Sequence, residues 1–335
     1  MTKFKKLVSL FLAIAVLMSI VTISVDAVEK NKFEYTLKTD EDSGITVAEI
    51  TGYKGLSAVK IPAKIGKYKV KSIGPRAFRN KKNIKSVVLG PNVKEINESA
   101  FSDCINLKKI NLRNVEFIGQ NAFRNCSSLE TVKIPSSLIG VTGDAFSGCK
   151  KLIKFKVGQG NYYYESIGGV LIRKGAPHIV AFPQAKGTSY VVPDGIKGIG
   201  AGAFKDNKTI RKIVIKKDVQ TIEENAFDGC SNLVNVKMGN NVTQIQAQAF
   251  RECRKLYSVK FSKLLTSIDE EAFLGCKKLK TIRLFRKLES IGDRAFGYMR
   301  KDGKYQKIKG VKIIAPSNSK AEKYAKTNGI SFKSK

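Results

Sequence analysis

The stretch Ile268–Leu284, IDEEAFLGCKKLKTIRL, contains the pattern that decides the fold. It reads I-x-x-x-A-F-x-x-C-x-x-L-x-x-I-x-L, and related segments recur around a repeated Ala-Phe pair. The phenylalanines of these pairs are spaced 22 or 23 residues apart except for one step of 58, and they are Phe78, Phe101, Phe123, Phe146, Phe204, Phe227, Phe250, Phe273 and Phe296. Self-similarity at a period of about 20 to 50 residues is the signature of a repeat protein, so we expect a stacked array.

Each repeat predicts one strand and one tight turn. In L-x-x-I-x-I segments such as Leu279–Leu284, the apolar spacing is typical of a short strand with one face on a core. The preceding I-x-x-x-A-F segment suits one helical or 3₁₀ turn that faces the same core. Single units bury little surface, whereas stacked units share a continuous core. We therefore predict an α/β solenoid with one parallel strand and short helical or 3₁₀ turns in each repeat of about 23 residues.

These repeats resemble the BspA-like leucine-rich repeats of bacterial surface antigens, which carry the pattern I-G-x-x-A-F-x-x-C-x-x-L-x-x-I-x-I-P. Ile45–Gly74 is similar to that family's entry module, and Ser319–Ile330 is similar to its closing helix. The resemblance therefore implies an N-terminal β cap and a C-terminal helical cap. Family members are secreted or surface-attached, and several are regarded as adhesins, which implies a binding protein without naming a ligand. Lys81, Asn207 and Met299 depart from the pattern because they replace the repeat cysteine.

The N-terminus has the composition of an export signal. Lys3, Lys5 and Lys6 precede an apolar run over residues 7–23 and a small-residue site ending at Ala27, which is typical of a cleaved signal peptide. An uncleaved membrane anchor is the alternative. No later segment is apolar enough to span a bilayer, so we expect a secreted protein, with any retention at the cell surface noncovalent.

Six segments are predicted along the chain. They are a signal peptide (1–27), an N-terminal cap module (28–72), a first repeat block (73–157), a divergent hairpin-containing module (158–198), a second repeat block (199–297) and a C-terminal cap (298–335).

The composition disfavours an enzyme and favours an anionic partner. The chain has 61 Lys and Arg against 28 Asp and Glu, a net charge of +33, and a single histidine, His178. Residues 1–27 hold three lysines and one aspartate, so the charge is still +31 without them. We predict no catalytic residue, no metal site and no cofactor, because one imidazole and evenly spread cysteines supply few ligands or bases. His178 follows Pro177 and is interpreted as a solvated turn residue.

The cysteines follow the repeat. They are Cys104, Cys126, Cys149, Cys230, Cys253 and Cys276, each three residues after a repeat phenylalanine. An even number in an exported chain is compatible with disulfides. We favour a ladder of buried free thiols instead, because cysteine is among the most buried residue types and parallel side chains are poorly oriented for bonding.

The long step between Phe146 and Phe204 predicts an inserted module. Residues 169–172 and 179–183 bracket a basic turn and indicate a hairpin. The preceding Tyr162, Tyr163 and Tyr164 are candidate aromatic contacts for a partner, since clustered tyrosines are favoured in interfaces. The alternative is that they cover the solenoid where its regular packing is interrupted.

The excess positive charge recurs at outward strand positions. Strand side chains alternate between faces, so the residue between the last two apolar residues of L-x-x-I-x-I points to solvent. The candidate anion-binding or partner-binding residues at this position and two residues before it are Lys109, Lys133, Lys154, Lys156, Lys212, Lys237, Lys260 and Arg283. Lys237, Lys260 and Arg283 are expected to form one column. A solvated basic face that only maintains solubility is the alternative.

Two functional hypotheses follow. The first is a leucine-rich-repeat binding protein whose basic strand face engages an anionic polysaccharide, a teichoic acid or an acidic host or cell-surface protein. The second is a protein-binding adhesin that uses the tyrosine-rich module, with its basicity serving only for noncovalent wall retention. Specific nucleic-acid readout is not expected, because no recognised nucleic-acid-binding motif occurs.

Overall fold

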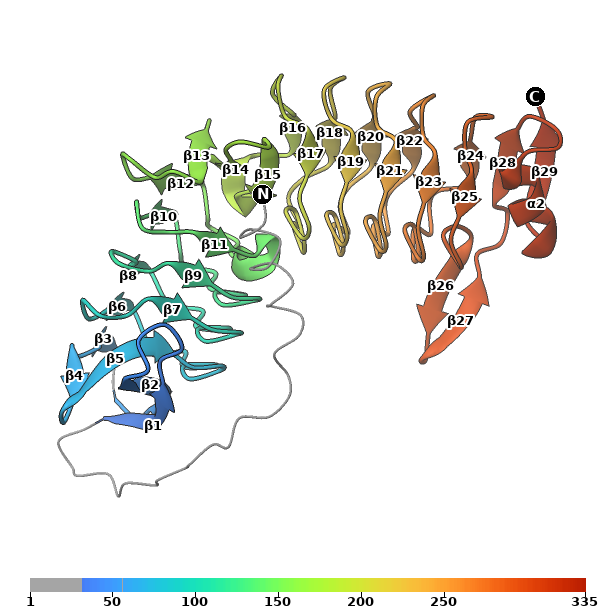
Figure 1. The fold of residues 1–335 in the computed structure, drawn as a ribbon. Coiled ribbons are helices and arrows are strands. Elements are labelled where there is room, and N and C mark those ends of the chain that lie inside the picture. The colour runs from blue at the N-terminus through green and yellow to red at the C-terminus, as the bar shows by residue number, and fades with distance from the viewer. Residues whose placement is uncertain (1–31, 56) are drawn as a thin grey trace.

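The computed structural model describes residues 32–55 and 57–335, so the predicted signal peptide lies outside the described residues. The described chain winds into coils that lie side by side (Figure 1). The solenoid, its N-terminal β cap, its central hairpin and its C-terminal helix are all present, as predicted. Each regular coil contributes to two parallel ladders on different sides of the array.

The first ladder contains the strands of the L-x-x-I-x-I segments and the equivalent strands of the caps and the insertion, and it is divided into four separate sheets. These strands are β3 (Ala58–Lys60), β6 (Ser86–Val88), β8 (Lys109–Asn111), β10 (Thr131–Ile134), β12 (Lys154–Val157), β16 (Ser189–Val191), β18 (Lys212–Val214), β20 (Asn235–Lys237), β22 (Ser258–Lys260), β24 (Thr281–Arg283), β28 (Lys312–Ala315) and β29 (Ser331–Ser334). We call the outward surface of these twelve strands the basic strand face.

Most strands of the second ladder end on the isoleucine of I-x-x-x-A-F, the exceptions being β11, which ends on Val141, and β15 of the insertion. Its strands are β5 (Tyr68–Ile73), β7 (Glu95–Ile96), β9 (Phe117–Ile118), β11 (Gly140–Val141), β15 (His178–Ala181), β17 (Gly198–Ile199), β19 (Thr221–Ile222), β21 (Gln244–Ile245), β23 (Ser267–Ile268) and β25 (Ser290–Ile291). The prediction of one strand per repeat is therefore wrong, because a regular coil has two. The short second strand forms because its backbone groups bond to both neighbouring coils.

The Ala-Phe turns form a third side, which we call the turn edge. These turns are mostly not helical, and η1 (Gly143–Phe146) is the 3₁₀ exception among those described. The residue before Ala adopts a left-handed conformation in most coils, for example φ of 55° at Asn225 and 57° at Gln248. Such a residue interrupts a helical turn. Bonds between coils replace helical ones, as where Phe227 N donates to Ala249 O at 2.7 Å.

Stacked phenylalanines form the centre of the core behind the turn edge. Ring centroids lie 4.7 Å apart for Phe204 and Phe227 and 4.9 Å apart for both Phe227 with Phe250 and Phe250 with Phe273. This column ends at helix α2 (Lys320–Thr327), where the Tyr324 hydroxyl donates to Phe296 O at 3.0 Å. The helix therefore closes the core with an aromatic residue and satisfies the last coil's backbone.

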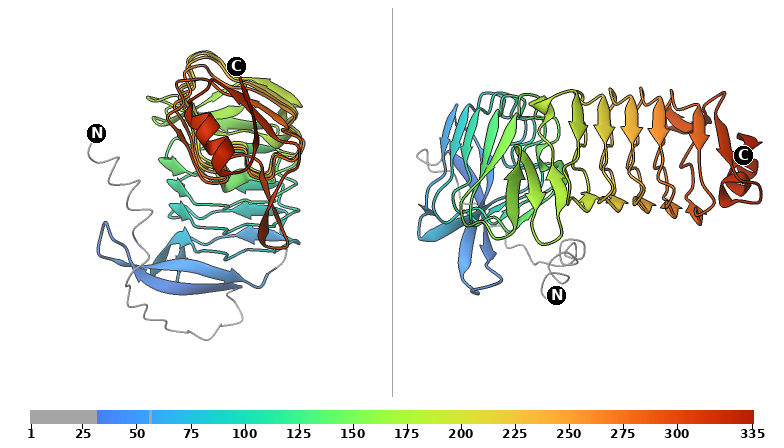
Figure 2. Two further views of the ribbon diagram at one scale, coloured as in Figure 1. Left: turned by 90° about the vertical axis from the view of Figure 1, so that its right-hand side faces the viewer. Right: turned by 90° about the horizontal axis from the view of Figure 1, so that it is seen from above.

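The remaining elements belong to the ends and to the insertion. At the N-terminus β1 (Phe33–Thr39) pairs antiparallel with β2 (Thr46–Tyr53), and β4 (Lys64–Ile65) pairs antiparallel with β5. A hairpin of β26 (Tyr298–Lys301) and β27 (Lys304–Lys307) projects near the C-terminal end (Figure 2). The insertion holds β13 (Tyr164–Ile167), β14 (Val170–Arg173), β15 and the 3₁₀ segment η2 (Gln184–Lys186).

The array bends at the insertion, so the first block and the second block run in different directions (Figure 1). Strands β14 and β15 cause this, because their alternating side chains serve two separate cores. Ile172 and Ile179 pack into the core of the second block, whereas Leu171 and Val180 pack into that of the first. The predicted hairpin is thus a wedge shared by both blocks.

The two blocks are in direct backbone contact at the bend. A Cβ atom added at Gly143 would lie 2.0 Å from Ala201 O and 2.7 Å from Val180 O. No larger residue fits at this position, so the junction is tightly packed. We expect the bend to be a fixed feature of the fold.

Candidate functional site

The basic strand face presents all eight predicted side chains to solvent, because each alternates with a buried or half-buried core residue. The register places Lys133 opposite Lys156, and Lys237 opposite Lys260. Neighbouring strands of a sheet are about 4.8 Å apart, so these pairs form short columns of like charge. Arg283 lies on the next coil but in a different sheet from Lys237 and Lys260, since its strand β24 pairs with β28, so the three residues do not form the single column that was expected.

Carboxylates are missing from this face. None of its twelve strands contains Asp or Glu, and none of the eight candidate residues forms an ion pair within residues 32–55 and 57–335. The basic residues fall into two groups, one on β8, β10 and β12 and one on β18, β20, β22 and β24. The intervening strand β16 carries Ser189 and the exposed Val191 at its outward positions.

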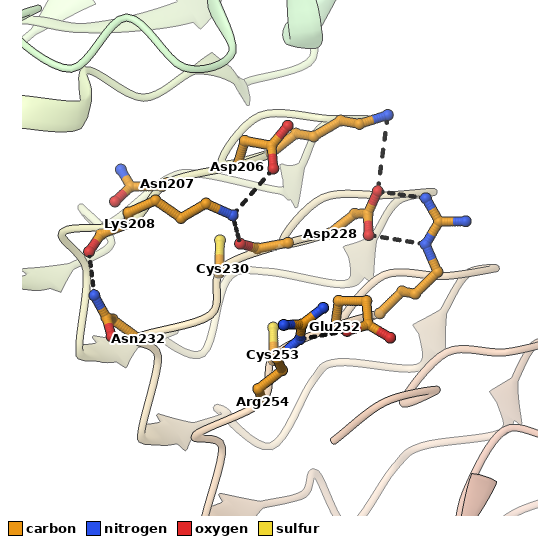
Figure 3. Close-up of polar contacts among 12 residues, drawn as sticks. Asp206, Asn207, Lys208, Asp228, Cys230, Asn232, Glu252, Cys253 and Arg254 are labelled. Carbon is orange, nitrogen blue, oxygen red and sulfur yellow. Dashed lines mark hydrogen bonds and ion pairs between the residues drawn. The ribbon is translucent and has the colours of Figure 1, made fainter. Parts of the chain in front are cut away.

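The turn edge of the same coils has the opposite organisation, because its charges are paired (Figure 3). Arg251 donates to both carboxylate oxygens of Asp228, at 2.9 and 2.7 Å. Arg254 donates to Glu252 at 2.7 Å, and Lys208 lies 3.1 Å from Asp206. These pairs stabilise the turn edge and leave few of its charges available to a ligand.

The tyrosine cluster is divided between surface and core. Tyr162 is 80% exposed, and its ring contacts that of the half-buried Tyr163 edge to face, with centroids 5.1 Å apart. Tyr164 is only 2% exposed, so its prediction as a contact residue is wrong. The Asn161 side chain accepts the Tyr164 backbone N–H at 2.7 Å and turns the chain inward, where the Tyr164 hydroxyl donates to Ile139 O at 3.1 Å.

The cysteines are buried free thiols in the structure, as the preferred interpretation had it. Each thiol donates to the carbonyl oxygen of the phenylalanine one coil earlier, as where Cys253 Sγ lies 3.2 Å from Phe227 O. Burial raises the pKa of Cys104 and Cys149 to about 12. Asn207 replaces the thiol in one coil, and its Oδ1 instead accepts the backbone N–H groups of Thr209 and Ile210 at 2.9 Å.

The structure has a cleft at the bend, and nothing in the sequence predicted it. It has a volume of about 710 Å³ and is lined by residues of both blocks, among them Asp144 of the first and Ala201 of the second. His178 lines it, with Nδ1 2.8 Å from Ala176 O and Nε2 3.4 Å from Glu223 Oε1. The interpretation of His178 as a solvated turn residue is therefore wrong. No sequence signal pairs it with Glu223, because two intervening strand pairings bring them together.

No group of His, Cys, Asp and Glu in the described ranges is arranged to hold a metal ion. Among the residues that the structure describes, there is also no helix long and apolar enough to cross a bilayer.

Comparison with known proteins identifies the repeat. The family described as BspA type leucine rich repeat region matches residues 53–166 and 179–301, with six copies. A search of curated proteins found no match.

Three solved structures show similarity to this chain. The pneumococcal vaccine antigen PcpA matches with a TM-score of 0.55 and 16% identity, over 91% of this chain and 98% of that chain. A leucine-rich repeat protein from Eubacterium ventriosum matches with a TM-score of 0.44 and 21% identity, over 78% of this chain and 92% of that chain. A leucine-rich repeat protein from T. pallidum matches with a TM-score of 0.41 and 25% identity, over 69% and 96% of the two chains.

The likeness to PcpA shows the fold, and the family match covers more than half of the sequence. This is a family of bacterial surface proteins, and its solenoids are typical of non-enzymatic, adhesin-like binding proteins. The chain belongs to the BspA type leucine-rich-repeat family.

Proposed function

We propose that the protein is a secreted or surface-associated adhesin-like binding protein whose basic strand face holds an anionic polymer, such as a teichoic acid or a sulfated glycan. The observation that carries this proposal is the absence of Asp and Glu from all twelve described strands of a face with eight exposed, unpaired basic side chains. Charges of one sign in repeated register match a polymer with regularly spaced negative groups.

The energetics support a role in binding. Two like charges directly opposite each other on neighbouring strands destabilise a sheet by less than about 1 kcal/mol. The turn edge pairs its charges, and the basic strand face does not. A bound polyanion would offset the repulsion between Lys237 and Lys260 by neutralising both.

A salt series with immobilised heparin or purified teichoic acid tests the proposal. The variant Lys237→Glu, Lys260→Glu, Arg283→Glu is expected to bind at least about tenfold more weakly, with a shallower dependence of log affinity on log salt, because three charged contacts are lost. The matched control is Lys301→Glu, Lys304→Glu, Lys307→Glu, which makes the same charge change on the exposed β26–β27 hairpin. Equal affinity of the two variants, or affinity independent of salt, contradicts the proposal.

A second candidate function is protein binding through the tyrosine-rich module, favoured by the exposure of Tyr162 and its contact with Tyr163. Deleting the whole module would remove Ile172 and Leu171 from the two cores, so point substitutions are the appropriate test. Tyr162→Ser with Tyr163→Ser should abolish capture of a protein partner from host surface extracts while leaving heparin affinity unchanged. Unchanged partner capture rejects this function.

A further inference from the structure

The bend cleft is independent of the basic strand face and has a different charge pattern. Its charged lining residues comprise four carboxylates and three basic side chains, on a chain whose net charge is strongly positive, and they are Glu98, Asp144, Glu223, Glu224, Arg173, His178 and Lys205. Most of these groups have partners within the protein. Glu223 contacts His178, and its second oxygen accepts Ala201 N–H at 3.0 Å. Lys205 lies 3.8 Å from Asp228.

Asp144 is the exception. The residue is only 7% exposed and lines the cleft from η1, yet its carboxylate has no hydrogen bond or ion pair to any described residue. The other two acids are engaged, since Glu98 lies 3.5 Å from Arg76 and Glu224 accepts from Asn225 at 2.8 Å. The carboxylate oxygens of Asp144 are not sealed from solvent, so this mostly buried side chain opens into the cleft, where it can accept hydrogen bonds from a ligand.

The chemistry of the missing partner follows from the carboxylate. An ionised carboxylate only accepts hydrogen bonds, so its partner must be a donor and is best a cation. A metal ion needs several oxygen ligands, and no such group is arranged in the described part of the chain. An ammonium or guanidinium group needs only one or two acceptors. The cleft volume of about 710 Å³ accommodates such a side chain together with adjacent backbone.

We propose that the bend cleft is a docking site for a lysine or arginine side chain of a protein partner, which pairs with Asp144. The partner's adjacent backbone lies along the cleft residues Asn97 and Gln120. The close contact at Gly143 keeps the two walls together, so the site is largely formed before binding. The protein then has two docking surfaces of opposite preference, one for polyanions and one for a basic residue.

Calorimetry with short peptides tests this site. The probes are acetyl-Gly-Arg-Gly-amide and acetyl-Gly-Lys-Gly-amide, with the citrulline peptide as a neutral analogue of similar shape. We expect saturable binding of at least one cationic peptide to the wild type and none of the citrulline peptide. Asp144→Asn should weaken binding about tenfold or more, because a charged hydrogen bond is lost. Glu130→Gln makes the same charge change at an exposed position outside the cleft and should bind as the wild type does.

Three outcomes overturn the proposal. They are no binding of either cationic peptide, equal binding by Asp144→Asn and the wild type, and binding of putrescine as tight as that of the peptides, which would assign the cleft to a free diamine. Should Asp144→Asn fold poorly, carbodiimide coupling of the lysine peptide to the wild-type protein decides the matter. A crosslink mapped to Asp144 supports the site, and one confined to other carboxylates rejects it.

Discussion

The basic strand face and the turn edge belong to the same coils, but charged side chains are unpaired on the first and mostly paired on the second. On the turn edge Arg251 and Asp228 are paired, and Cys253 and Phe227 fit against the neighbouring coil. On the basic strand face Lys237 and Lys260 stand opposite each other without a carboxylate. Side chains on the turn edge are constrained by packing, whereas outward strand positions are free of it. The charge of the strand face is therefore the part of each repeat that the fold does not require.

The largest expected effect comes from ionising the buried thiols behind the turn edge. The folded-state pKa of Cys104 and Cys149 is raised by burial to about 12, above that of an exposed thiol. The stability they contribute is complete below about pH 8.5 and is lost as the pH rises towards 12, at about 1.4 kcal/mol per pH unit for each thiol. Urea unfolding at about pH 8 and about pH 10 measures the loss.

A variant without two of the thiols separates their contribution from every other effect of pH on stability. Cys104→Ala with Cys149→Ala should show a shallower decline of the free energy of unfolding between the two pH values. In the native protein at about pH 8, all six thiols should be unreactive towards a thiol reagent, and they should react once urea unfolds the chain. An equal decline in the variant and the wild type contradicts the expected role of the thiols.

Disrupting the phenylalanine column is expected to have the next largest effect on stability. Phe227→Ala should lower the free energy of unfolding by about 3 to 5 kcal/mol, because it opens a cavity between Phe204 and Phe250. Tyr257→Ala on the exposed side is the control, and it should change stability by less than about 0.5 kcal/mol. Denaturant titrations of both variants measure the two losses in free energy of unfolding. Similar losses for Phe227→Ala and Tyr257→Ala would contradict the expected role of the phenylalanine column.

Breaking a charge pair of the turn edge should cost less. Arg251→Met leaves the Asp228 side chain, which is 8% exposed, with Lys205, 3.8 Å away, as its remaining ion-pair partner among the described residues. We expect a loss of about 1 to 2 kcal/mol, since the arginine is itself one-third exposed. Arg254→Met removes a more exposed arginine and should cost under about 0.5 kcal/mol. Thermal unfolding ranks the two, and the reverse order argues against a stabilising Arg251–Asp228 pair.

The smallest expected effect has the opposite sign. Lys237→Thr removes one of two facing positive charges and should raise the free energy of unfolding by a few tenths of a kcal/mol. The same change should weaken heparin binding, so stability and affinity move in opposite directions. Lys278→Thr, on an exposed loop outside the ladders, should alter neither by as much. Calorimetric melting and the heparin salt series measure the two quantities, and a destabilised Lys237→Thr would contradict the repulsion argument.

Much of the fold follows from the spacing of a few residue types. Isoleucine, the Ala-Phe pair, cysteine and leucine recur at fixed offsets, and each occupies the same place in successive coils. The outward positions of Lys133 and Lys237 follow from the alternation of strand side chains. The second strand of each coil could not be predicted from the sequence, because a two-residue strand such as β19 forms only through bonds to the coils beside it.

The sequence by itself determined the repeat and the exposure of the basic residues, because both depend on local period and polarity. It also supplied the motif that resembles the family, and it favoured a buried thiol ladder over disulfides. The tertiary structure alone decided the bend, the inward turn of Tyr164, the contact of His178 with Glu223 and the cleft around Asp144. These features depend on how the β14–β15 wedge orients two cores, and that orientation comes from packing between segments distant in the chain.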